Sequence, residues 1–134
     1  KMIDEERDSQ AMAIGMSIAD MARKMKVKAV IALTASGYTP AMLSQAKLSV
    51  PIFACCPCKN ICRSIKLYRG VYPIPLDFDN TIDKKSLAIM DKFLTDKLGL
   101  TNGDYVVITG SVPELLVGGT NFIKVHQIIN DQRI

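Results

Sequence analysis

The stretch Lys26–Lys47, KVKAVIALTASGYTPAMLSQAK, decides the fold. Within it, Ala29–Leu33 is a run that is apolar at every position, as in a strand buried on both faces. A loop of small and hydroxyl residues, Thr34–Thr39, then leads into an amphipathic segment that begins near Pro40, a residue suited to the first turn of a helix. A strand that runs directly into a helix indicates an α/β unit.

The loop Thr34–Thr39 is the first candidate binding site. Unpaired backbone N–H groups and the positive end of the helix dipole meet at the start of a helix, and together they favour an anion such as phosphate. The same residues also fit a simpler interpretation, in which Ser36 or Thr39 only caps the helix. Taken alone, the loop favours capping, because a single short loop is a weak motif.

Composition limits the classes of protein to consider. The chain has 134 residues, 49% of them hydrophobic and 22% charged, which predicts one globular domain with a real core. The 17 Lys and Arg residues are scattered and only 6% of residues are aromatic, unlike the clustered basic faces of nucleic-acid-binding proteins. No apolar run approaches a membrane span, and the N-terminus is no signal peptide. We therefore expect a cytoplasmic protein with neither a nucleic acid nor a membrane as partner.

Outward from Lys26–Lys47, the sequence predicts helices that alternate with strands. Residues 1–7 are expected to be a tail or linker, and residues 8–134 one domain, which begins with a helix from Asp8 to about Lys26. Further strands are predicted at Val50–Cys55, Val71–Leu76, Tyr105–Thr109 and Asn121–Ile129, and further helices at Asn60–Tyr68 and Asp83–Leu98. The prolines of the third strand place it at a sheet edge. The last strand follows without a crossover helix, so we expect it to be antiparallel and at an edge of an otherwise parallel sheet with helices on both faces.

The four cysteines all lie within Cys55–Cys62. Cys55 and Cys58 form a C-x-x-C pair at a strand-to-helix junction, which suits a dithiol redox site, because a helix N-terminus lowers the pKa of a thiol. A four-thiolate zinc site is conceivable, but such sites usually draw on two separated pairs. The sequence favours a third interpretation over both, that of buried or incidental cysteines in a reducing compartment.

No catalytic or metal-ligating set is predicted. His126 is the only histidine and falls in the last predicted strand with no evident partner, so it is interpreted as an ordinary strand residue. Asp77, Asp79 and Asp83 are spaced loosely like a cation-binding loop but lack its closing glutamate, so turn and cap roles are preferred.

A second loop, Gly110–Thr120, strengthens the case for a binding site. In a doubly wound sheet, ligands bind beyond the carboxyl ends of the strands where the strand order reverses. If the first and fourth strands are neighbours at that point, the two loops face one crevice. This arrangement predicts a phosphate seat at Thr34, Ser36, Gly37 and Thr39, with the second loop closing over the rest of the ligand, in a site built to bind and not to react.

Five motifs in order resemble the C-terminal domain of pyruvate kinase, over about Asp8 to Ile128. They are Lys28–Thr34 followed by Ser36-Gly37, then Pro51–Ala54, Leu67–Pro73, Gly103–Ile108 and Gly119–Asn121. The resemblance implies a three-layer α/β/α sandwich around a five-stranded mixed sheet whose last strand is antiparallel.

In that family the domain is regulatory, and phosphoryl transfer between phosphoenolpyruvate and ADP takes place on a separate barrel domain with Mg²⁺ and K⁺. The resemblance therefore implies an effector-binding and subunit-contact domain of a homo-oligomeric glycolytic kinase, inactive by itself and without a cofactor of its own. The family's effector phosphate site carries over onto Thr34, Ala35, Ser36, Gly37, Tyr38 and Thr39. The closing loop carries over onto Gly110–Gly119, including Ser111, Pro113, Glu114, Gly118 and Gly119.

The loop sequences also bear on which effector is expected. Ala35 and Tyr38 stand where Lys and Arg can appear in the family, and Glu114 adds a negative charge to the closing loop. A bisphosphate needs several charge-assisted hydrogen bonds. A monophosphate, such as AMP or a ribose or hexose phosphate, is therefore expected in preference to fructose 1,6-bisphosphate, or else the site is lost. Two alternatives to this function are a dithiol redox protein using Cys55 and Cys58 and a stand-alone phosphosugar-binding protein.

Overall fold

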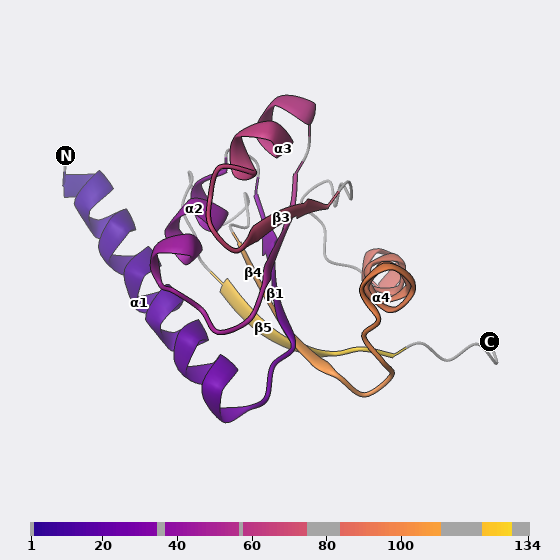
Figure 1. Ribbon diagram of the computed structural model, residues 1–134. Helices are drawn as coiled ribbons and strands as arrows, with labels where there is room; N and C mark the ends of the chain where they lie inside the picture. Colours follow the sequence, from indigo (N-terminus) through magenta and orange to yellow (C-terminus); the bar gives the residue numbers. More distant parts are fainter. Residues whose placement is uncertain (1, 35–36, 57, 75–83, 111–121, 130–134) are drawn as a thin grey trace.

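A computed structural model of the chain describes residues 2–34, 37–56, 58–74, 84–110 and 122–129, with the backbone alone for residues 2–8 (Figure 1). Helices and strands follow one another in the order α1 (Met2–Lys24), β1 (Ala29–Leu33), α2 (Tyr38–Gln45), β2 (Ile52–Cys55), α3 (Lys59–Ile65), β3 (Val71–Ile74), α4 (Lys84–Leu98), β4 (Tyr105–Gly110) and β5 (Phe122–Gln127). Every predicted strand and helix is present, with ends shifted by a few residues.

The five strands form one mixed sheet in the order β3-β2-β1-β4-β5. β1 lies at the centre and pairs in parallel with β2 and with β4, so that Leu33 is the register partner of both Cys55 and Gly110. β5 runs antiparallel to β4, with Val107 opposite Val125. These findings confirm the predicted fold class, the antiparallel last strand, and the places of the third and last strands at the two edges.

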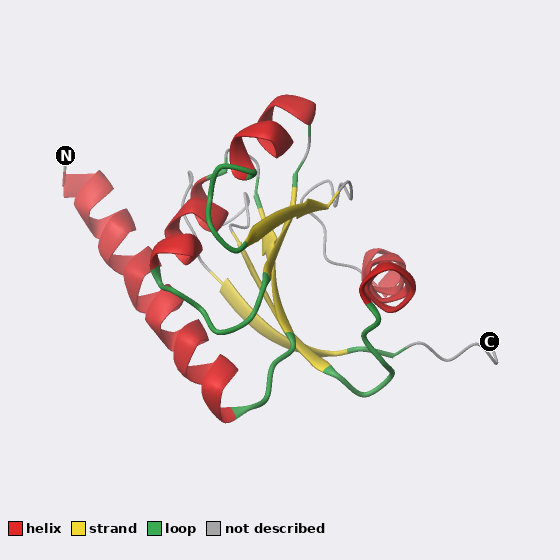
Figure 2. Ribbon diagram, in the orientation of Figure 1, coloured by secondary structure: helices red, strands yellow, loops and turns green. Residues whose placement is uncertain are grey.

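The helices cover the two faces of the sheet unequally, as Figure 2 shows: α1, α2 and α3 lie on one face and α4 alone lies on the other. Each face of the sheet has its own core. Ile18 of α1, Leu43 of α2 and Ile65 of α3 pack into the first core. Met90 and Leu94 of α4 pack into the second core, on the opposite face. Neighbouring residues of a strand point to opposite faces. Val30 and Ala32 therefore join the first core, whereas Ala29 and Ile31 join the second. Both faces of β1 are buried, as its continuous apolar pattern predicts.

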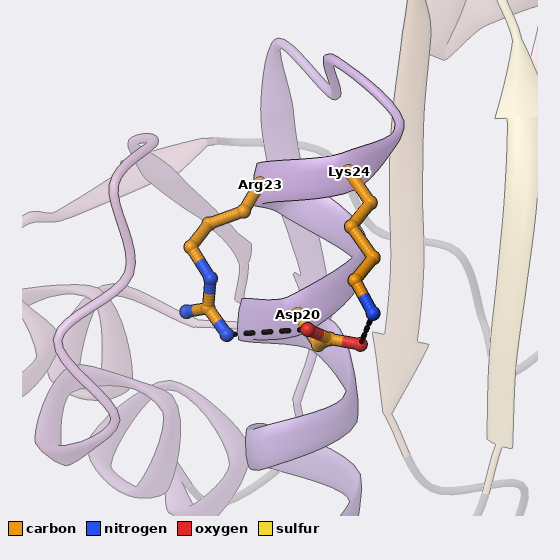
Figure 3. Close-up of polar contacts among 3 residues, drawn as sticks. All are labelled: Asp20, Arg23 and Lys24. Atoms are coloured by element: carbon orange, nitrogen blue, oxygen red, sulfur yellow. Dashed lines mark hydrogen bonds and ion pairs between the residues drawn. The ribbon is translucent and has the colours of Figure 1, made fainter.

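α1 is longer than the sequence predicts. It begins at Met2, so the helix includes residues that were expected to form a tail before Asp8. In its last turns the Asp20 carboxylate is 3.2 Å from Arg23 Nη2 and 3.2 Å from Lys24 Nζ (Figure 3). The hydrogen bond from Lys24 is the main reason that the pKa of Asp20 lies below its usual value. The three side chains are well exposed, so these pairs add little to stability. Among the described residues, no helix combines the length and apolarity needed to cross a lipid bilayer.

Candidate functional site

The two predicted binding loops leave the sheet from neighbouring strands. Leu33, the last residue of β1, is the register partner of Gly110, the last residue of β4. The approach is unusually close at this point: a Cβ atom added to Gly110 would lie 2.5 Å from the Leu33 carbonyl oxygen and 3.0 Å from its Cβ. Only glycine fits there without moving the backbone. The expected adjacency of the first and fourth strands, on which the predicted crevice depends, is therefore confirmed.

Thr34 and Gly37 order the start of the first loop. The Gly37 backbone N–H donates a hydrogen bond of 2.7 Å to Thr34 Oγ1, and the Gly37 carbonyl accepts one of 3.2 Å from the Ala41 N–H in the first turn of α2. Gly37 has a φ of 92°, which favours glycine over any residue with a side chain. The Thr34 N–H donates to the Cys55 carbonyl at 3.3 Å, so the loop is also tied to the end of β2.

The structure places only part of the predicted site. Thr34 and Gly37 are brought together by the hydrogen bond described above. α2 begins at Tyr38, two residues before Pro40; Tyr38 is half-buried, and Thr39 is 2% exposed, within the packing of the helix. Other predicted site residues lie outside the described residues: Ala35, Ser36, Ser111, Pro113, Glu114, Gly118 and Gly119. Asp77, Asp79 and Asp83 lie outside them as well.

None of the three sequence-based interpretations of the cysteines, including the favoured one of incidental cysteines in a reducing compartment, included a disulfide, and the structure has one. The disulfide joins Cys56 to Cys62, while Cys55 is a buried free thiol and Cys58 an exposed one. Cys55 and Cys56 point to opposite faces of the sheet: Cys56 lies in the core covered by α1–α3, and Cys55 lies in the core covered by α4. Burial raises the pKa of the Cys55 thiol to about 12, the opposite of what a redox nucleophile needs. The alternative of a dithiol redox protein using Cys55 and Cys58 is therefore not favoured.

His126 has a partner that the sequence did not reveal. Its Nε2 lies 2.8 Å from Asp91 Oδ1, with side chains 11% and 6% exposed. Asp91 belongs to α4 and accepts a second hydrogen bond, of 3.2 Å, from the Ile129 N–H. One signal was available: Asp91 falls on the apolar stripe of its helix, four residues after Leu87 and three before Leu94, and a carboxylate there needs partners.

The described residues contain no group of three or more His, Cys, Asp or Glu side chains placed to hold a metal ion. This finding covers Cys55–Cys62 except Pro57, the segment in which a zinc site was conceivable. The described part of the predicted site consists of the Thr34 hydroxyl and the backbone that leads into α2, and the N–H groups of Thr34 and Gly37 are already hydrogen-bonded within the protein.

Known proteins similar to this chain agree on one family. A family model described as the pyruvate kinase alpha/beta domain matches residues 12–126. The chain is 36% identical over 116 residues to a pyruvate kinase of Geobacillus stearothermophilus, covering 87% of this chain and 20% of that protein. It is 33% identical over 124 residues to a pyruvate kinase of Sporosarcina psychrophila, covering 92% of this chain and 21% of that protein. The chain thus spans about a fifth of the length of the curated relatives it matches.

Solved structures share the fold. A crystal structure of a pyruvate kinase from Cryptosporidium parvum superposes with a TM-score of 0.75 at 21% identity, covering 88% of this chain and 22% of that one. A Cryptosporidium parvum pyruvate kinase in complex with ADP gives a TM-score of 0.72 at 23% identity, covering 88% and 23% of the two chains.

Proposed function

Because the chain belongs to the pyruvate kinase family, as its alpha/beta domain, we propose that it is the effector-binding and subunit-contact domain of a pyruvate kinase. In this proposal the transfer of phosphate from phosphoenolpyruvate to ADP, with Mg²⁺ and K⁺, takes place on a barrel domain in the remaining four-fifths of the protein. In this proposal no catalytic step is assigned to this chain. The chain alone is expected to be inactive.

The observation that carries the effector role is the pairing of β1 with β4. It supports a crevice at the carboxyl ends of the two central strands, where the strand order reverses. The loop after β1 supplies Thr34 and Gly37, already ordered by their hydrogen bond, and leads into the first turn of α2. A phosphate placed there would accept hydrogen bonds from backbone N–H groups and hydroxyls.

We propose a monophosphate as the effector, either AMP or a ribose or hexose phosphate. The loop Thr34–Thr39 contains no Lys or Arg, and Glu114 adds a negative charge to the loop that follows β4. Binding by neutral donors suits one phosphate group, whereas two phosphates would need several charge-assisted hydrogen bonds. Fructose 1,6-bisphosphate is accordingly expected to bind more weakly than the monophosphates.

Calorimetric titration tests the effector role. AMP, ribose 5-phosphate, glucose 6-phosphate and fructose 1,6-bisphosphate are titrated in turn into the 134-residue chain. We expect saturable heat with at least one monophosphate, and its loss in Ser36→Asp, because the new carboxylate would repel the phosphate. Ser9→Asp is the matched control, since it adds the same charge on an exposed turn of α1. Heat with none of the four ligands would contradict the effector role and leave the subunit-contact role standing.

The subunit-contact role is assigned to the open edge of β5. This strand ends the sheet and pairs only with β4 among the described strands, so one row of its backbone groups is available to a second copy of the chain. We expect the chain to self-associate, as measured by sedimentation equilibrium. Val125→Glu, which places a charge on β5, should weaken this association, whereas Leu67→Glu, at an exposed position after α3, should not. A wild-type chain that stays monomeric at high concentration would contradict this role.

The alternative of a stand-alone phosphosugar-binding protein is not favoured, because the chain matches pyruvate kinases over about a fifth of their length. The two functions differ in what the rest of the coding sequence holds. An upstream segment with a pyruvate kinase barrel would support the regulatory role, and a complete reading frame without one would support the stand-alone protein.

A further inference from the structure

Two cysteines, Cys58 and Cys62, line one pocket beside α3, and Cys62 is bonded to a third, Cys56. The pocket has a volume of about 440 Å³ and is lined by Cys58, Lys59, Cys62, Arg63, Lys66 and Pro73. It brings a free, exposed thiol, that of Cys58, next to Cys62, one half of the Cys56–Cys62 disulfide. Cys58 and Cys62 are also joined through their backbones, because the Cys62 N–H donates to the Cys58 carbonyl at 3.0 Å.

The two sulfur atoms of the disulfide differ in access. Cys62 is half-buried and lines the pocket, whereas Cys56 is 5% exposed within the core between the sheet and α1–α3. Thiol–disulfide exchange proceeds by attack of a thiolate on one particular sulfur, and access decides which one. A thiolate that enters the pocket therefore reaches Cys62 and not Cys56.

The pocket also selects by charge. Three of its six lining residues, Lys59, Arg63 and Lys66, are cations, and none is a carboxylate. All three cations are exposed, and within the described part of the chain none of them is held in an ion pair. A cluster of one sign raises the local concentration of the opposite charge.

We propose that the Cys56–Cys62 disulfide and the Cys58 thiol form a thiol–disulfide exchange site for small anionic thiols, which enter through this pocket. The incoming thiolate forms a bond to Cys62 Sγ, the Cys56–Cys62 bond breaks, and Cys56 leaves as a thiolate that takes a proton from water. The Cys58 thiolate then attacks Cys62 Sγ, forms the Cys58–Cys62 bond and releases the small thiol. One disulfide is exchanged for another, so no external oxidant or reductant is consumed.

The exchange would change what the disulfide holds together. The Cys56–Cys62 bond ties α3 to the residue that follows β2, so it fixes the helix on the sheet. A Cys58–Cys62 bond would join two residues one helical turn apart, and α3 would lose its disulfide link to Cys56.

Two thiols of similar size and different charge test the proposal on the full 134-residue chain: 2-mercaptoethanesulfonate, an anion, and 2-mercaptoethanol, which is neutral. Rates are expressed per thiolate, and the products are mapped by mass spectrometry after acid quenching. We expect the ratio of anionic to neutral rates to fall about tenfold when Lys59, Arg63 and Lys66 are all changed to Gln. The same change at Lys84, Lys85 and Lys92, exposed residues of α4 on the other face of the sheet, removes equal charge and should leave the ratio unchanged.

Cys58→Ser separates the two steps. The variant should stop at a mixed disulfide on Cys62, whereas the wild-type chain should proceed to the Cys58–Cys62 disulfide. If the triple variant does not fold, the wild-type chain is assayed in 0.5 M salt instead. Screening should lower the reaction rate of the anionic thiol and leave that of the neutral thiol unchanged. Two results on the products would overturn the proposal: attachment of the small thiol to Cys56 in place of Cys62, or no mixed disulfide in Cys58→Ser. Two results on the rates would also overturn it: the same anionic-to-neutral rate ratio in the pocket and α4 variants, or a disulfide that reacts only after the chain is unfolded in urea.

Discussion

Asp91 of α4 and His126 of β5 are joined by a buried hydrogen bond of 2.8 Å between Oδ1 and Nε2, across the face of the sheet that α4 alone covers. The second carboxylate oxygen accepts the Ile129 N–H. One side chain thus connects α4 with an edge strand and with the residues that follow that strand.

Asp91→Ala is expected to destabilise the domain by about 3 kcal/mol, because it leaves the His126 ring and the Ile129 N–H without their acceptor in a buried place. Urea denaturation followed by circular dichroism measures the change. Asp96→Ala is the matched control: it removes an exposed carboxylate from the same helix and should change stability by no more than about 0.5 kcal/mol. Equal effects of the two substitutions would contradict the importance of the buried pair.

Gly110→Ala should destabilise the fold where β1 and β4 end. The added Cβ would meet the backbone oxygen of Leu33, and the β1–β4 pairing would have to open to relieve the contact. Gly70→Ala provides the comparison, because Gly70 has a φ of 77° and nothing within 4 Å of an added Cβ. Gly70→Ala should lower the free energy of unfolding by about 1 kcal/mol, because alanine disfavours a positive φ. Gly110→Ala should lower it clearly more in the same urea assay. The reverse order would show that the β1–β4 ends move apart easily.

Cys55 is expected to resist alkylation in the native chain at pH 8, where Cys58 reacts readily. Its pKa is raised to about 12 by burial, from a reference value of 9.0. Above pH 9 the unfolded chain releases the thiol proton while the folded chain keeps it, so stability falls with rising pH across this window and is fully present below it. We expect Cys55→Ala to lose less stability than the wild type between pH 8 and 10. A steeper loss in the variant would contradict the assignment.

Thr34→Val tests whether the ordered start of the first loop serves the proposed effector. The substitution removes the hydroxyl oxygen that accepts the Gly37 N–H and keeps the size of the side chain. Effector affinity should fall about tenfold, in line with the loss of one hydrogen bond worth about 1.4 kcal/mol. Thr34→Ser keeps the hydroxyl and should bind nearly as well as the wild type. Unchanged affinity in Thr34→Val would place the ligand elsewhere.

Much of the fold could be predicted because its signals are local. The continuous apolar run of β1, the two prolines near β3 and the lack of a helical sequence pattern before β5 each express a rule that acts within a few residues. The start of α1 was missed because charges of both signs in residues 1–7 were interpreted as a tail, although Glu and Arg are good helix formers.

The contacts that sequence reasoning missed join distant residues or depend on which face a side chain occupies. Asp91 and His126 are far apart in the chain, and only the packing of α4 on the sheet brings them together. For the cysteines, the C-x-x-C spacing drew attention to Cys55 and Cys58 and no disulfide was predicted, but side chains alternate along a strand. That alternation sends Cys55 toward α4 and leaves Cys56 on the side of α3, where Cys62 lies.

The central place of β1 also has a consequence for how the chain acquires its structure. β4 is the fourth strand in sequence, yet it inserts beside β1. The edge of β1 that pairs with β4, with Ala29 opposite Val106, is therefore covered only after β4 has been synthesised. During synthesis, β1 and β2 can pair while the other edge of β1, apolar on both faces, stays exposed until the ribosome has released β4. Long-range parallel pairing is slow to form. The nascent domain therefore passes through a stage at which it is prone to aggregate, and completion of β4 ends that stage.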